Sequence, residues 1–175
     1  MMEKSTLILT RKIQLIVDLP TQEERKEAFD KLYRWRNRCF RAANLIVSHL
    51  YIQGMVKEFL YLSEGIVPKL VDEKKDEAGI LQRSRINTTY HVISNRFKGE
   101  IPMNILSCLN NRLHSTFNKD YQEYWRGEAS LKNFKRDMAF PFGAESISKL
   151  SYHPEKKSFC FRLFQLPFKT YLGKD

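Results

Sequence analysis

Apolar positions along the chain change their spacing several times, and each change marks a predicted element. Residues 6–18 alternate loosely and are rich in Ile, Leu, Val and Thr, which indicates a β-strand that Pro20 closes. From Thr21 to about Tyr51 the apolar positions fall at helical spacing, and Thr21 with Glu24 predicts a capping box at the start of this helix. Gly54 then interrupts the pattern, and the charged run at 71–77 favours a solvated loop or helix end.

Two further helices are predicted in the middle of the chain. Residues 80–97 have helical character, which Gly99 and Pro102 end. A third long amphipathic helix follows, runs to Trp125 and terminates at Gly127. Its apolar residues recur every fourth position, at Ile105, Leu109, Leu113, Phe117 and Tyr121.

The spacing then changes from helical to extended. Short apolar runs predict strands at 138–142, 146–152 and 158–166, and the polar residues 153–157 fit a hairpin turn. A strand, a helical insertion and more strands give an α+β fold, in which the first strand pairs with the last ones across roughly 120 residues. We therefore expect a β domain made of residues 1–20 and 138–175, interrupted by a helical insertion at 21–137.

Charge narrows the class of partner. The 175 residues include 30 Lys and Arg against 20 Asp and Glu, a formal charge of +10. An apolar content of 42% with 13% aromatic residues argues for a folded protein and against a disordered basic tail. This balance favours a polyanionic partner, although ribosomal and membrane-surface proteins share it. The N-terminus is too polar for a signal peptide or a membrane span, so we expect a cytoplasmic protein with no membrane partner.

The first helix carries a one-sided basic stripe. Lys31, Arg34, Arg38 and Arg41 fall within about 80° of one another on a helical wheel, opposite the apolar face. A solvated helix face normally mixes both signs of charge, but no acidic residue occurs between Lys31 and Lys57. Nucleic acid binding is therefore favoured over plain solvation. Asn44 joins the stripe as a candidate contact.

A second acid-poor region follows, with Glu100 as its only acidic residue between 78 and 119. Its neutral donors and rings suit RNA or single strands. A third candidate is the basic joint at 126–136, which links helix to strand and carries residue types that hold phosphate backbones. The candidate contacts from these two regions are Arg83, Arg85, Asn87, Arg96, Arg126, Lys132, Lys135 and Arg136.

Catalytic chemistry has no visible signature in the sequence. The four histidines share no metal-ligand spacing, and the predicted strands lack the paired carboxylates of two-metal nucleases. Three widely spaced cysteines indicate neither a zinc site nor a disulfide framework. We expect no catalytic residues, no metal and no cofactor.

The stretch YQEYWRGEASLKNFKRDMAFPFG, together with the N-terminal strand LILTRKIQLIV and the following helix with Arg34 and Asn44, resembles the wedge and recognition half of the miniature type V CRISPR effectors and their TnpB transposon relatives. The resemblance implies a small, partly open oligonucleotide-binding-type barrel with a helical recognition insertion. It also implies that the lobe binds guide RNA and the guide–target heteroduplex through backbone contacts, with the joint among those contacts. The RuvC nuclease half of that family has no counterpart in this sequence.

The resemblance leaves several uses open. The chain is expected to be a nuclease-deficient, non-catalytic binder of guide-type RNA or an RNA–DNA heteroduplex, as an excised lobe or as a stand-alone regulator. The alternative is a decoy of anti-CRISPR type, which blocks an intact type V effector, or a nuclease-half protein, by protein contact or by competing for guide RNA. Self-association through the helical insertion is a further expectation.

Overall fold

The computed structural model describes residues 12–64 and 85–171, which form two compact units. The sheet unit comprises Met1–Ala28 and Glu145–Asp175, and the helical unit comprises Phe29–Ala144. The sequence had placed these boundaries at residues 20 and 138. Among the described residues, no helix combines the length and the apolarity that a membrane crossing needs.

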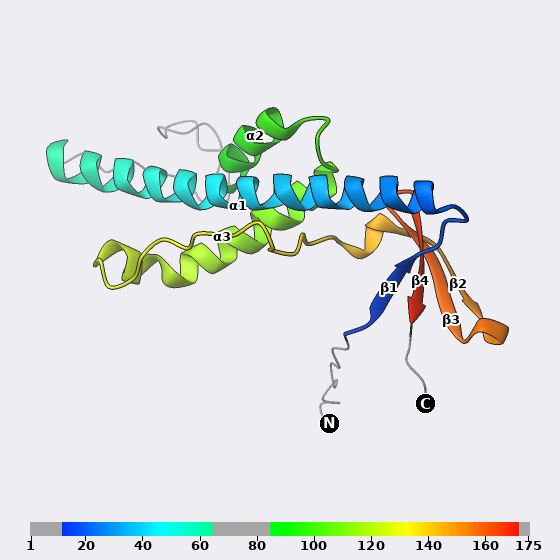
Figure 1. Ribbon diagram of the computed structural model, residues 1–175. Coiled ribbons are helices and arrows are strands. Elements are labelled where there is room, and N and C mark those ends of the chain that lie inside the picture. Colours follow the sequence, from blue (N-terminus) through cyan, green and yellow to red (C-terminus); the bar gives the residue numbers. More distant parts are fainter. Residues whose placement is uncertain (1–11, 65–84, 172–175) are drawn as a thin grey trace, which may run out of the picture. The chain divides into compact units, whose positions relative to one another are not determined.

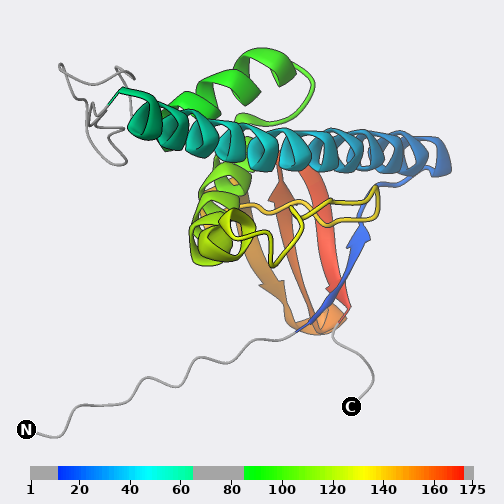
Figure 2. The ribbon, with the colours of Figure 1, turned by 90° about the vertical axis from the view of Figure 1, so that its left-hand side faces the viewer.

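The sheet unit contains one antiparallel sheet with the strand order β1-β4-β3-β2. Its strands are β1 (Gln14–Val17), β2 (Ile147–His153), β3 (Ser158–Leu163) and β4 (Leu166–Tyr171). The first strand pairs with the last, in a register that runs from Gln14 opposite Tyr171 to Val17 opposite Phe168. The predicted return of the first strand is therefore confirmed, and Figure 2 shows the four strands in this order.

The sheet is more open than the partly open barrel that was predicted, and one of its predicted strands is divided in two. Within the described chain the sheet is open, with β1 and β2 as its edges, so it does not close into a barrel. The predicted strand at 158–166 is a hairpin of β3 and β4, turning at Phe164 and Gln165 with φ of 49° and 72°. Two central residues with positive φ fit a type I′ turn, whose usual signal is Asn-Gly or Asp-Gly. The sequence Phe-Gln gives no such signal, so β4 was missed.

A predicted strand at 138–142 is wrong, because residues 137–143 are neither helical nor extended in a sheet. Pro141 has no N–H to donate to a ladder, and no strand of the described chain lies against this run. The ring of Phe140 instead packs edge-on against that of Trp35, with centroids 6.3 Å apart. The apolar run is therefore anchored by its side chains.

The helical unit is built from α1 (Gln22–Glu64), which begins in the sheet unit, α2 (Arg85–Phe97) and α3 (Met103–Trp125). Figure 1 shows α3 running along α1. The predicted capping box is present, because the Thr21 backbone N–H donates to Glu24 and the Glu24 N–H donates to Thr21 Oγ1 at 3.2 Å. The predicted endings are also confirmed, since Gly99 and Gly127 follow α2 and α3 with φ of 78° and 71°.

The first helix is longer than its sequence pattern predicted, because Gly54 does not break it. A Cβ atom at Gly54 would lie 3.1 Å from Cε2 of Tyr121 on α3, which is closer than ordinary van der Waals contact. Glycine is therefore placed here for the close approach of α1 and α3. The core of the unit consists of fully buried side chains from all three helices, including Ile46, Leu50, Ile93 and Ile105.

Candidate nucleic-acid interface

The basic stripe lies on the side of α1 that faces away from the core, as predicted. Arg34 and Arg41 are exposed, and among the described residues neither has a carboxylate partner. Lys31 lies over the ring of Trp35, with Nζ 5.3 Å from the ring centroid. Arg38 is half-buried and forms an ion pair with Glu100. Among the described residues, Arg38 is thus the member of the stripe that a carboxylate neutralises, and Arg34 and Arg41 keep their charges free of any carboxylate or ring contact.

Residues 126–144, the return segment, run back along α1 after α3 ends (Figure 1). The side chain of Asn44 holds this segment by pairing with the backbone of Phe134 in both directions. The Phe134 N–H donates to Asn44 Oδ1 at 2.8 Å, and Asn44 Nδ2 donates to the Phe134 carbonyl at 3.0 Å. Further along, Trp35 packs on Phe140. The chain therefore runs antiparallel to α1 between these two contacts.

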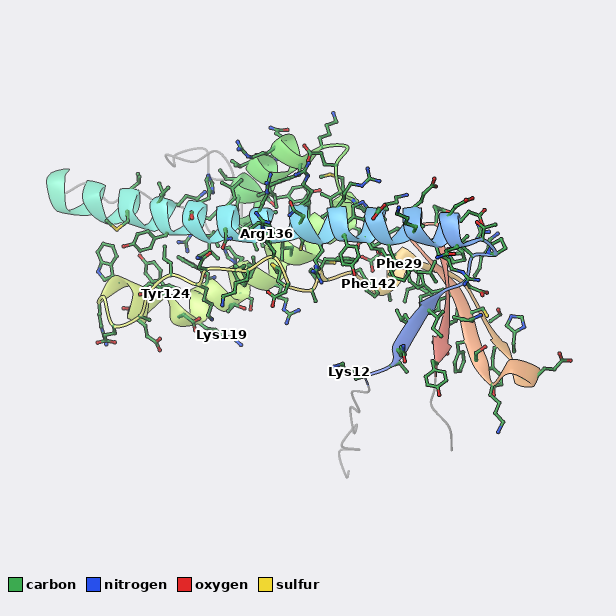
Figure 3. The ribbon with its side chains drawn as sticks, viewed as in Figure 1. Lys12, Phe29, Lys119, Tyr124, Arg136 and Phe142 are labelled. Carbon is green, nitrogen blue, oxygen red and sulfur yellow. The ribbon has the colours of Figure 1, made fainter. Side chains whose placement is uncertain are left out.

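This antiparallel course brings two groups of cations to about the same level along α1. The contacts match position 134 to position 44 and position 140 to position 35, so Arg136 lies level with about residue 41 of α1. Figure 3 labels Arg136 beside the middle of α1. Lys135 and Arg136 are exposed and, like Arg41, have no carboxylate partner among the described residues. Exposed cations of two segments that are distant in sequence therefore lie at about the same level along α1.

The other cations of the joint are partly neutralised within the protein. Lys132 forms an ion pair with Asp120 of α3, and Arg126 lies 4.0 Å from the carboxylate of Glu128. The hydrogen bond from Lys132 lowers the pKa of Asp120, and the same bond raises the pKa of Lys132. Both groups are therefore charged at neutral pH and satisfy each other, which leaves Lys132 less free to bind a phosphate.

The residues predicted from the second acid-poor region are spread over α2. Arg85 is half-buried at the first residue of the helix, while Asn87 and Arg96 are exposed. Arg83 lies outside the described residues. Arg85 and Asn87 each make an interaction within the protein, so neither is counted among the groups left open to a ligand.

Two side chains with reactive groups, Cys39 and His49, are buried or hydrogen-bonded within the helical unit. Burial raises the pKa of the Cys39 thiol to about 12, which leaves it protonated and unreactive at neutral pH. Burial also lowers the pKa of His49, whose Nδ1 lies 3.0 Å from Gln53 Nε2 and 2.9 Å from Thr89 Oγ1. This network connects α1 to α2. Among the residues the structure describes, no three His, Cys, Asp or Glu side chains are grouped to hold a metal ion.

Sequence reasoning missed how the return segment is held. Asn44 was predicted to contact nucleic acid, but its amide is engaged by the backbone of Phe134 across 90 positions of sequence. Asn104 of α3 has a similar role, since the Gly143 N–H donates to its Oδ1 at 3.3 Å. The sequence signal was limited to asparagines within amphipathic helices, where an amide that becomes buried needs a partner. Asn44 is therefore a positioning residue.

Comparison with known proteins gives this chain no relative by sequence. No protein-family model matches it, and no curated protein matches it.

Proposed function

We propose that this protein is a non-catalytic nucleic-acid-binding protein whose helical unit binds the phosphate backbone of a structured RNA or an RNA–DNA hybrid. The observation that carries the proposal is that four cations of α1 and the return segment, Arg34, Arg41, Lys135 and Arg136, are exposed and have no carboxylate partner among the described residues.

Electrostatics supports a polyanionic partner for this surface. Like charges held close together repel, and this cost is offset when a polyanion binds them. The paired hydrogen bonds between Asn44 and Phe134 fix the return segment, with its cations, against α1. Contacts of this kind bind the backbone without reading bases, so the sequence of the nucleic acid has to be supplied by another part of the complex.

The element order supports the more specific form of the proposal. A first strand that pairs with the last strand across a helical insertion is the layout expected of a wedge with a recognition insertion, as in the compact RNA-guided nucleases that the sequence resembles. In this form the open sheet is part of an oligonucleotide-binding-type wedge, and the ligand is a guide-type RNA or its heteroduplex with target DNA.

The salt dependence of binding tests the proposal. Hairpin RNA and an RNA–DNA hybrid of equal length are titrated with the full chain at increasing salt concentration. If four phosphates are neutralised, affinity falls roughly 50- to 150-fold between about 50 and 200 mM salt. An affinity that stays constant across this range, or no binding at low salt, would contradict the proposal.

A decoy that binds protein is the second candidate, and one feature of α1 favours it. Ile52, Met55 and Val56 are exposed on a helix with no charged residue between Ala42 and Val56. An apolar surface of this kind suits contact with another helix. A miniature type V effector that co-purifies with the chain after RNase treatment would support the decoy. In that case this chain should still inhibit the effector when Lys135 and Arg136 are changed to Glu.

A further inference from the structure

Two aromatic rings on neighbouring strands of the sheet unit pack against each other at a tilt and stay exposed. Tyr152 of β2 lies opposite Phe159 of β3, with ring centroids 4.8 Å apart. Tyr152 is 49% exposed and Phe159 is 39% exposed. Among the described residues, the Tyr152 hydroxyl forms no hydrogen bond. These two residues, the ring pair, are therefore an aromatic surface that the sheet unit leaves open.

The ring pair continues an apolar face that is buried elsewhere. Side chains alternate along a strand, so Phe159, Phe161 and Leu163 of β3 share one face of the sheet. Phe161 stacks on Phe168 of β4 with centroids 5.9 Å apart, and both are buried. The face is thus packed at Phe161 and exposed at the ring pair. Large apolar rings usually lie in the packed part of such a face, which makes their exposure at the sheet's end informative.

Cations lie at the end of the sheet that holds the ring pair. Lys157 follows the turn between β2 and β3, and Lys12 precedes β1 at the same end, while Lys149 lies further along β2 where its register shifts. Glu155 is the only acidic residue in the hairpin. Two exposed ring faces with cations at the same end of the sheet complement a ligand that has flat rings and phosphates, which are the two parts of a single-stranded nucleic acid.

We propose that Tyr152 and Phe159 form a stacking platform for the unpaired bases of single-stranded RNA. The inference rests on the proposed nucleic-acid function and extends it to a second site of different chemistry. The helical unit binds backbone phosphates, and the platform binds base faces. Every base has such a face, so the platform accepts any base and adds affinity without strict sequence preference.

Cross-linking to the unaltered protein locates the site without any mutation. An oligouridylate that carries 4-thiouridine is irradiated with the full chain, and the modified peptides are identified by mass spectrometry. We expect cross-links at Tyr152 and Phe159. Cross-links found only within residues 126–136 would support the phosphate surface and overturn the platform.

Substitutions then measure how much the rings contribute to binding. Tyr152→Ala and Phe159→Ala each weaken oligouridylate binding by at least about fivefold, the lower limit for one stacked base. Stacking involves no counterion, so the fold-loss is the same at low and high salt. Tyr171→Ala is the matched control, because Tyr171 is 48% exposed on the opposite face of the same sheet and its loss leaves affinity unchanged. Tyr152→Phe keeps the ring and retains binding.

The outcomes separate this inference from the proposed function. Equal affinities for the Ala variants of Tyr152, Phe159 and Tyr171 would overturn the platform, while salt-dependent binding of hairpin RNA would leave the phosphate surface intact. If the wild-type chain does not bind hairpin RNA but still cross-links at the ring pair, the phosphate surface alone is overturned. A protein ligand for the ring pair would appear as oligouridylate binding that no substitution on the sheet changes, which also contradicts the platform.

Discussion

Asn44 shows how one side chain can determine the shape of a distant segment. Its carboxamide oxygen accepts from the N–H of Phe134, and its amide nitrogen donates to the carbonyl of the same residue. The contact is partly buried, so without it the N–H and the carbonyl of Phe134 lose their partner and are only partly hydrated by water. Removing a partner from such groups costs about 1–3 kcal/mol.

We predict that Asn44→Ala lowers the free energy of unfolding by about 1–3 kcal/mol in chemical denaturation. Alanine is the better helix former by up to about 0.7 kcal/mol, so the measured loss is reduced by that amount. Asn111→Ala is the control, because Asn111 is exposed in the interior of α3 and makes no hydrogen bond with the described residues. It should stabilise slightly. Equal denaturation midpoints for the two variants would show that the Asn44 contact contributes nothing.

At the scale of elements, α1 and the return segment each contribute exposed cations at about the same level along the helix. Arg41 is on the helix, whereas Arg136 is on an irregular segment without secondary structure to orient it. The anchor at Phe134, two residues before Arg136, limits where that side chain can reach. Lys132, by contrast, is committed to Asp120. The position of each cation relative to the anchors decides whether it remains available for a ligand.

Charge reversal on the return segment tests this distinction. We predict that Lys135→Glu and Arg136→Glu each weaken binding of hairpin RNA and flatten the salt dependence by about one unit of slope. Lys26→Glu changes the net charge by the same amount, but Lys26 lies on α1 between Glu24 and Glu27, outside the proposed surface. Its slope should stay that of the wild type. If all three variants lose affinity equally, the charge acts only as a diffuse field.

At the scale of the whole molecule, each compact unit contains buried apolar residues of its own. Phe161, Leu163 and Phe168 are buried in the sheet unit, and Ile46, Leu109 and other residues are buried in the helical unit. The sheet unit has 28 residues at one end of the chain and 31 at the other, a size at which a fold has little stability to spare. Loss of one buried ring should therefore affect the two units unequally.

We predict that Phe168→Ala, which removes a ring that is 5% exposed, costs the sheet about 3–5 kcal/mol. Amide hydrogen exchange should then lose protection in β1, β3 and β4 while the centres of α1 and α3 keep theirs. Salt-dependent binding of hairpin RNA should remain. Simultaneous loss of protection in both units would mean that the molecule unfolds as one cooperative body.

The sequence by itself determined the elements whose signals are local. The spacing of the apolar residues predicted α2 and α3, and Thr21 with Glu24 predicted the start of α1, because these patterns depend on neighbours within one helical turn. It also predicted that the first strand returns to the last, because a lone strand needs a partner. The one-sided charge of α1 was visible for the same local reason.

Only the tertiary structure decided the features that depend on distant contacts. Gly54 lies within α1 at a point where Tyr121 of α3 comes too close for a side chain. Residues 138–142 stay irregular because Trp35 and Asn44 hold the return segment. The turn at Phe164 adopts positive φ under the pairing of β3 with β4. A cation's availability depends on whether a carboxylate lies within reach in space, as Asp120 does for Lys132. The spacing of residues along the chain does not predict the distance between a cation and a carboxylate in the folded protein.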